Sequence, residues 1–147
     1  MSLFQSFDIS ASGMTAQRFR TDIIAENVAN VNTTRTEDGT PYTRQVVTFE
    51  EKTQTAYQNL ITMGKNNKAG LGVKVSSVQY DTDTDYTVEY DPTHPDADEN
   101  GYVTYPNVNI VTEMTNLIDA SRSYEANATA LESSKNLAQA GLNIGQS

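Results

Sequence analysis

The sequence contains no cysteine and no tryptophan, and few of its 147 residues are basic. Without cysteine the chain can form no disulfide bond, thiolate metal site or cysteine nucleophile. Only 37% of the residues are hydrophobic, which argues against a large globular core and for one domain or one elongated unit. No apolar run approaches the roughly 20 residues that a membrane span needs. Residues 1–10 lack both a basic residue and an apolar signal-peptide core, so no cleaved secretion signal is expected.

Positive charge is scarce throughout. Ten lysines and arginines face nineteen aspartates and glutamates, which gives a formal net charge of −9. Eight of the acidic residues lie between Asp81 and Glu99, with no lysine or arginine among them. Because an acidic surface repels a phosphate backbone, we expect no binding to nucleic acid.

The last third of the chain has the spacing of a helix that faces a partner helix. Residues 107–140 contain no glycine or proline, and Gly141 follows where a helix can stop. A helix of this length is a rod of roughly 50 Å, too long to cover its own apolar stripe. The predicted seam, at alternating steps of three and four, consists of Ile110, Met114, Leu117, Ser121, Tyr124, Ala128, Leu131, Lys135, Ala138 and Leu142.

The spacing of apolar residues predicts a second long helix over residues 3–31, with apolar residues on two faces. Two apolar faces indicate packing against more than one neighbour, whereas a surface helix usually shows one. The alternative is that Ser10 and Gly13 interrupt the helix, because glycine disfavours helix interiors. One face carries Leu3, Phe7, Ala11, Met14, Ala25 and Val28, and the other carries Ile9, Ala16, Phe19 and Ile23.

The middle of the chain reads as a small β-containing insert. Strands are predicted at 42–49, 73–80, 86–90 and 102–105, and the glycine- and asparagine-rich stretch 63–72 is predicted to be mobile. The predicted fold is therefore mainly α, with long N- and C-terminal helices (1–31 and 107–147) that pair like a coiled coil around a central β-containing domain (32–106). Two helices would leave so much apolar surface exposed that we expect other chains to complete them.

One loop invites a metal-binding interpretation. Asp96, Asp98, Asn100 and Gly101 match the opening of a calcium loop, but Asn107 stands where a bidentate glutamate is required. A calcium-responsive binding module that uses loop 91–101 is the alternative function. The single histidine, His94, defines no catalytic triad. We therefore expect that the chain is not an enzyme, and we also expect no bound metal ion or cofactor.

Three blocks of the chain resemble the flagellar axial proteins, the family of rod, hook and hook-associated subunits. The N-terminal block is 12–17 (SGMTAQ) with 22–33 (DIIAENVANVNT). The C-terminal block includes Asn109, Glu113-Met114, Leu117-Ile118 and 120–127 (ASRSYEAN). The loop between them, HPDAD at 94–98 followed by GYV at 101–103 and PNV at 106–108, looks like that of a proximal rod subunit.

The resemblance implies a structural subunit of the basal-body rod. Such subunits leave the cell through the flagellar type III export apparatus without a cleaved signal, and polymerise into a torque-bearing shaft around a central channel. The implied partners are copies of the chain, other rod subunits and the adaptor that joins the rod to the membrane ring. The implied location is the rod outside the cytoplasmic membrane, which is periplasmic in a two-membrane cell.

On this interpretation the terminal helices carry the assembly interface. We expect Asn27 and Asn30 to cap or bridge backbone groups where helix meets loop, and Arg122 and Glu125 to pair across subunits. The predicted interface residues are Phe7, Met14, Phe19, Ile23, Asn27, Val28 and Asn30 in the first helix, and Met114, Leu117, Ser121, Arg122, Tyr124, Glu125 and Leu131 in the second.

Overall fold

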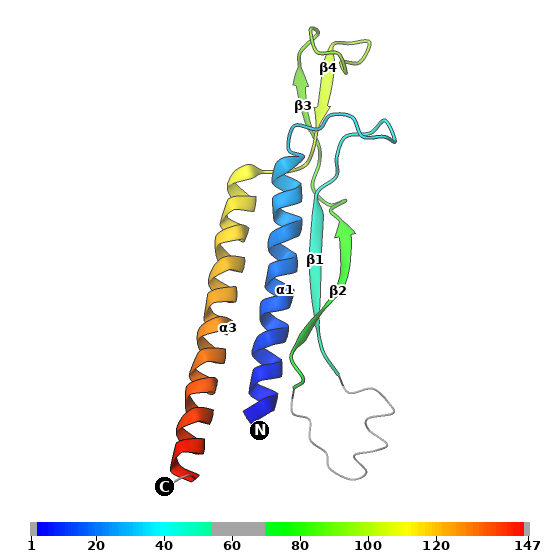
Figure 1. Cartoon of the computed structure of the whole chain (residues 1–147). Helices are drawn as coiled ribbons and strands as arrows, with labels where there is room; N and C mark the ends of the chain where they lie inside the picture. Colours follow the sequence, from blue (N-terminus) through cyan, green and yellow to red (C-terminus); the bar gives the residue numbers. More distant parts are fainter. Residues whose placement is uncertain (1–2, 54–69, 146–147) are drawn as a thin grey trace. The chain divides into compact units, whose positions relative to one another are not determined.

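A computed structural model describes residues 3–53 and 70–145 and shows two long terminal helices with a small β region between them (Figure 1). This confirms the prediction of a mainly α chain with a β insert. The stretch 63–72, predicted to be mobile, lies outside the described residues except for its last three. The elements in chain order are α1 (Leu3–Ala29), β1 (Gln45–Glu51), β2 (Val73–Tyr80), β3 (Thr87–Tyr90), β4 (Tyr102–Tyr105) and α3 (Ile110–Gly145).

Helix α1 continues through Gly13, as the prediction of one long helix over 3–31 requires, and α3 continues through Gly141, where an end was expected. The alternative of a break at Ser10 and Gly13 is wrong, because α1 is helical at both positions. A Cβ on Gly13 would lie 2.8 Å from Oδ1 of Asn127 in α3, so glycine here permits close approach of a second helix. Gly141 does not end α3, which runs to Gly145. One interior glycine costs only about 1 kcal/mol, which neighbouring helix-forming residues offset.

The chain divides into two compact units. Unit 1 comprises Met1–Phe19, Phe49–Ser76 and Ala120–Ser147, and unit 2 comprises Arg20–Thr48 and Ser77–Asp119. Each of α1, β1, β2 and α3 contributes residues to both units.

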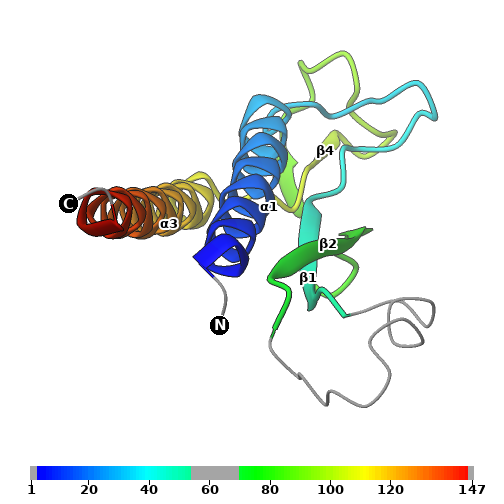
Figure 2. The ribbon, with the colours of Figure 1, turned by 60° about the horizontal axis from the view of Figure 1, so that its bottom comes forward.

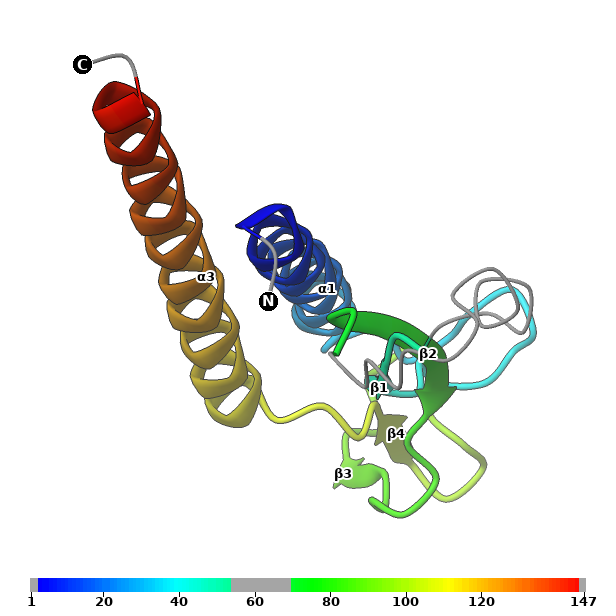
Figure 3. The same cartoon turned by 90° about the horizontal axis from the view of Figure 1, so that it is seen from below.

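The strands form two antiparallel pairs: β3–β4 lies wholly in unit 2, and β1–β2 has residues in both units. Strands β1 and β2 form one two-stranded sheet (Figure 2), and β3 and β4 form the other (Figure 3). The second pair has Tyr90 opposite Tyr102 and Val88 opposite Thr104, with Val103 fully buried on the other face. Within unit 2, α1 and α3 are antiparallel neighbours. Arg20 of α1 hydrogen-bonds Asn116 of α3 at 3.5 Å, whereas Asn27, further along α1, bonds Glu113, which precedes Asn116 in α3.

In unit 1, the start of β2 is attached to the first half of α1 through one serine. Ser12 Oγ donates to the carbonyl of Ile9 at 2.7 Å and accepts from the backbone N–H of Val73 at 3.1 Å. Gly72, directly before Val73, has φ +98°, and a Cβ built on it would overlap Ser12 Oγ. Glycine is therefore required at residue 72 by both its backbone conformation and the approach of the helix.

We expect Gly72→Ala to lower the free energy of unfolding by about 2 kcal/mol, because it combines a positive φ with a steric overlap. Gly39→Ala is the matched control: Gly39 has φ +78°, but no atom lies within 4 Å of an added Cβ. The control substitution should lower the free energy of unfolding by about 1 kcal/mol, because only the backbone conformation disfavours it. Urea unfolding followed by circular dichroism measures both, and equal losses would show that the contact with Ser12 contributes nothing.

Candidate functional site

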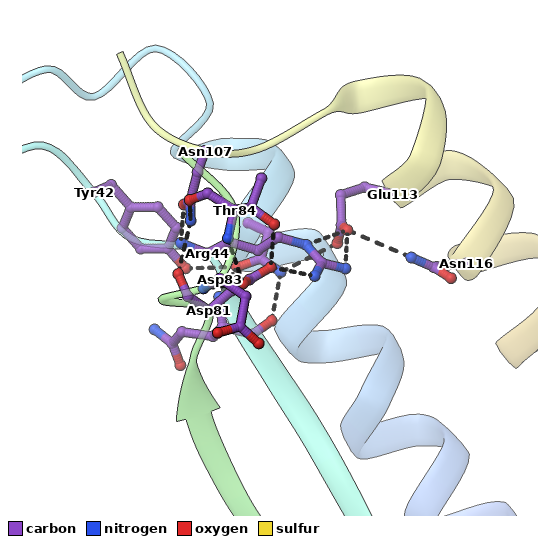
Figure 4. A network of polar contacts seen from close by, with 10 residues as sticks. Tyr42, Arg44, Asp81, Asp83, Thr84, Asn107, Glu113 and Asn116 are labelled. Carbon is purple, nitrogen blue, oxygen red and sulfur yellow. Dashed lines mark hydrogen bonds and ion pairs between the residues drawn. The ribbon is translucent and has the colours of Figure 1, made fainter. Parts of the chain in front are cut away.

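A network of polar side chains joins α1, the start of β1, the end of β2 and the start of α3 within unit 2 (Figure 4). We call it the polar junction. Its members come from segments far apart in the sequence, and two of them, Asn27 and Glu113, are completely buried. Buried polar groups persist only where hydrogen bonds compensate their lost hydration. The polar junction consists of Asn27, Tyr42, Arg44, Asp81, Asn107 and Glu113.

Asn27 uses every hydrogen-bonding position of its side-chain amide. Its Nδ2 donates to the carbonyl of Gln45 at 2.9 Å and to Oε2 of Glu113 at 3.1 Å. Its Oδ1 accepts from the backbone N–H of Gln45 at 2.8 Å and from the hydroxyl of Tyr42 at 2.9 Å. The amide thus pairs with both backbone groups of Gln45, as a neighbouring strand would, and fixes β1 to the end of α1.

Arg44 lies between two carboxylates from different elements. Its guanidinium contacts Glu113 Oε1 through Nε at 2.9 Å and Nη2 at 2.7 Å, and Asp81 Oδ2 through Nη1 at 3.0 Å. Burial works to lower the pKa of Arg44, but the hydrogen bonds that it donates to Glu113 and Asp81 outweigh burial and raise that pKa. Burial likewise works to raise the pKa of Asp81, and bonds from Arg44 and Thr84 lower it instead. Arg44 and Asp81 are therefore charged and paired at neutral pH.

Asn107 and Tyr42 complete the polar junction. Asn107 Oδ1 accepts from the backbone N–H of Arg44 at 2.8 Å, and its Nδ2 donates to the carbonyls of Asp81 at 2.8 Å and Thr84 at 3.1 Å. Burial, followed by the nearby charge of Glu26, raises the pKa of Tyr42 to about 12. Its hydroxyl therefore stays a hydrogen-bond donor to Asn27. The arrangement fixes elements in place and presents no nucleophile paired with a general base.

We expect the free energy of unfolding to fall as the solution is acidified below about pH 4, the ordinary pKa of aspartate. The folded-state pKa of Asp81 is lowered, so its ion pair stabilises the fold above the unfolded-state value and is lost as the pH falls through the folded-state value. Urea unfolding between pH 7 and pH 2 measures this. Asp81→Asn should be less stable at pH 7 and depend less on pH, and parallel curves for the two proteins would contradict the assignment.

The face of α3 covered by the rest of the chain is rotated from the predicted heptad seam. Among the predicted seam positions, Ile110, Met114, Ser121, Tyr124, Lys135 and Leu142 are exposed. The covered positions are largely small or polar, because such side chains permit close approach and hydrogen bonding to other elements. They are Glu113, Asn116, Leu117, Ala120, Ser123, Asn127, Ala128, Leu131, Ser134 and Ala138.

The predicted interface residues therefore occupy different environments. Asn27 bridges the backbone of Gln45, and Asn30 caps α1 by donating to the carbonyl of Glu26 at 3.0 Å, which confirms their predicted local roles. Asn27 is inaccessible, so it can affect assembly only by positioning the elements that it joins. The exposed members of the predicted interface are Phe19, Met114, Ser121, Arg122, Tyr124 and Glu125. Its half-buried members are Phe7, Met14, Ile23, Val28, Asn30, Leu117 and Leu131.

The calcium hypothesis receives no support from loop 91–101. Asp98 Oδ1 accepts from the backbone N–H groups of Asn100 and Tyr102, both at 2.8 Å, and Asp91 Oδ1 accepts from Thr93. Asp96 instead accepts from Thr34 Oγ1 at 2.8 Å. Within residues 3–53 and 70–145 no three histidine, aspartate or glutamate side chains are grouped so that they could hold a metal ion. The carboxylates thus act as turn-stabilising acceptors.

In the part of the chain that the structure describes, neither helix is apolar and long enough to span a bilayer. The apolar surface of α3 is thus distributed along an otherwise polar helix. Its exposed large side chains include Val111, which is 75% accessible, Met114 and Ile118 near the start, and Leu137, Leu142 and Ile144 near the end.

Two segments of the chain match known protein families. Residues 7–35 match the family described as "Flagella basal body rod protein", and residues 99–144 match "Flagellar basal body rod FlgEFG protein C-terminal". The first match contains α1 from its second turn onward, and the second contains β4 and nearly all of α3. The terminal helices are thus the parts shared with these families.

Similarity to individual proteins extends over nearly the whole chain. "Flagellar basal-body rod protein FlgC" of Borreliella burgdorferi is 44% identical over 150 aligned residues, which cover 98% of each chain. The protein of the same name from Bacillus subtilis is 42% identical and covers 99% of this chain and 100% of its own. The one from Salmonella typhimurium is 37% identical, with the same coverage.

Proposed function

Because the chain belongs to the FlgC family of flagellar basal-body rod proteins, we propose that its terminal helices pack coiled-coil-like against those of neighbouring subunits to build the wall of the rod. The chain is a structural subunit of the basal-body rod and assembles there with other rod components. The proposal concerns how assembly is achieved: segments 1–31 and 107–147 form the packed wall, and residues 32–106 form the domain attached to it. No catalytic role is proposed.

One observation carries this proposal: α3 directs small and polar side chains toward its own chain and leaves large apolar ones uncovered. Near its start, Ile110, Val111, Met114 and Ile118 recur at the spacing of a single helix face, and all four are exposed. We call them the outer α3 patch. Exposed patches of this kind are covered by a partner in proteins that assemble. Neighbouring helices that supply similar patches would bury them at close range.

The remaining parts of the proposal follow from this incomplete packing. Terminal segments whose apolar side chains gain their contacts only on assembly can be unfolded at little cost, which suits passage through the flagellar type III export apparatus. Long packed helices would then give the rod the stiffness to transmit torque around the central channel. Copies of the chain, other rod subunits and the rod-to-ring adaptor are the proposed neighbours, outside the cytoplasmic membrane.

We expect Ile118→Asp to reduce incorporation into rods by at least about tenfold, because burying an unpaired carboxylate costs more than 1.4 kcal/mol. Ile118 is exposed in the isolated chain, so the variant should fold and be exported normally. The matched control is Thr112→Asp, also exposed and in the same helix but on another face. Quantitative immunoblots of purified basal bodies and of exported protein measure both. Normal incorporation of Ile118→Asp would exclude the outer α3 patch from the interface.

A further inference from the structure

The β3–β4 hairpin of unit 2 has one face turned to solvent, and its opposite face carries a fully buried residue in β4. Opposite residues are Tyr90 with Tyr102 and Val88 with Thr104, so these side chains share a face because alternate residues of a strand point the same way. The other face carries Val103, which is fully buried. We call Val88, Tyr90 and Tyr102 the outer hairpin face.

The outer hairpin face has the composition of a covered surface although it is exposed. Val88 is 57% accessible, Tyr90 66% and Tyr102 47%. A sheet face that is turned to solvent normally carries polar residues. Tyrosines are enriched at protein–protein contacts because they bury a large area at low entropic cost. The two rings are already in edge-to-face contact, with centroids 5.2 Å apart and an interplanar angle of 66°, so little further ordering is needed.

Two aspartates of the loop that joins β3 to β4 lie next to the two tyrosines. Asp91 directly follows Tyr90, and Asp98 accepts the backbone N–H of Tyr102 at 2.8 Å. The hydrogen bonds from Thr93 and Tyr102, respectively, lower the pKa values of these two aspartates, which are therefore ionised at neutral pH.

The arginines near the hairpin are already paired with acidic residues. No lysine or arginine occurs between residues 75 and 121. Of the arginines that contact this region, Arg35 pairs with Asp96 at 3.7 Å and Arg44 belongs to the polar junction. An aromatic surface with neighbouring acidic residues is complementary to arginine, whose guanidinium stacks on tyrosine and bonds carboxylates in a bidentate manner.

We propose that the outer hairpin face is a docking surface for another protein that presents an arginine between apolar residues. The arginine stacks on Tyr90 or Tyr102 and pairs with Asp91 or Asp98, while the apolar neighbours cover Val88. This surface lies on the hairpin and not on the terminal helices. The inference therefore goes beyond helix-mediated assembly, and either can fail without the other.

In the first test, the isotope-labelled full chain is titrated separately with three capped pentapeptides, RVRVR, KVKVK and EVEVE, at physiological salt. Binding is measured from the changes in the amide chemical shifts of the chain in its nuclear magnetic resonance spectrum. The shifts should concentrate at residues 88–91 and 98–103. RVRVR should bind about fivefold more tightly than KVKVK, because the guanidinium adds stacking, and EVEVE should produce no shift. Equal binding of the arginine and lysine peptides, or shifts confined to other parts of the chain, would overturn the proposal.

Matched variants locate the binding surface. Tyr90→Thr and Tyr102→Thr retain strand-forming residues at exposed positions and should each weaken RVRVR binding about fivefold. Tyr80→Thr is the control, since Tyr80 is 67% accessible and lies at the end of β2, outside the hairpin. An equal loss in the control would show non-specific attraction to tyrosine and contradict the proposal. The amide spectrum of each variant shows whether the hairpin is folded.

The second test uses assembled basal bodies. A photo-reactive amino acid replaces Tyr90 in one strain and Tyr80 in another, and the cross-linked peptides are identified by mass spectrometry. The position-90 probe should join a neighbouring basal-body protein at a peptide that contains arginine. Cross-links to peptides without arginine, or no cross-link from rods that have incorporated the variant, would contradict the docking surface while leaving helix-mediated assembly intact.

Discussion

Glu113→Ala should lower the free energy of unfolding by about 3 kcal/mol, one of the two largest single-residue effects that we expect in this chain. Glu113 is fully buried and pairs with Arg44 Nη2 at 2.7 Å. Breaking a buried ion pair by removing one partner costs about 3–5 kcal/mol. The lower end applies because the Arg44 side chain is 22% exposed and keeps Asp81 as a partner. Urea unfolding of the full chain at pH 7 measures the loss.

Two further variants test the cause of that loss. Glu113→Gln keeps the shape of the side chain but removes its charge, so we expect an intermediate loss. Glu125→Ala removes an exposed glutamate from the same helix, and its effect should stay within about 0.5 kcal/mol of zero. If Glu113→Ala unfolds at the same urea concentration as the control, the polar junction does not contribute to stability.

Asn27→Ala is expected to cost about 2–3 kcal/mol. The substitution removes four hydrogen bonds and leaves both backbone groups of Gln45 and the hydroxyl of Tyr42 without this partner in a buried site. Asn32→Ala, at an exposed position just beyond α1, is the matched control and should be nearly neutral. Far-ultraviolet circular dichroism during urea unfolding gives both values, and equal midpoints would exclude a stabilising role for the Asn27 amide.

The double variant of Asn27 and Glu113 separates their mutual contact from their other bonds. The two side chains share one hydrogen bond of 3.1 Å, so the two losses should not be additive, and the coupling should be on the order of 1 kcal/mol. Strict additivity would mean that each residue acts only through its remaining partners.

Local patterns were sufficient to predict the elements of the fold. Alternation and turn residues predicted strand 73–80 with the bounds that β2 has, and the other strands within about three residues. Helical periodicity predicted both helices, including an unbroken first helix, whereas the end expected near Gly141 lies at Gly145. Gly13 is tolerated because Asn127 lies against it, a contact between residues far apart in sequence that local propensity cannot anticipate.

The polar junction was not predicted from the sequence. Asn27 and Glu113 are 86 residues apart, and neither belongs to a recognisable motif of paired charges. The seam on α3 was inferred from apolar spacing, yet the covered face centres on Glu113, Ala120 and Asn127. Apolar periodicity shows that a face avoids water without showing which chain covers it. One usable signal was present, a lone Arg44 beside a strand, since a charged residue there requires an acidic partner.

The sparse hydrophobic interior has a thermal consequence. Among the described residues the buried apolar side chains are Ala16, Ile24, Tyr42, Val103 and Ala120, of which two are alanines. Heat capacity rises on unfolding in proportion to the apolar surface newly hydrated, and hydration of polar groups reduces it. A subunit held together mainly by amides and ion pairs therefore has a small heat-capacity increment and a flat stability curve. Its resistance to unfolding changes little between a cold and a warm environment.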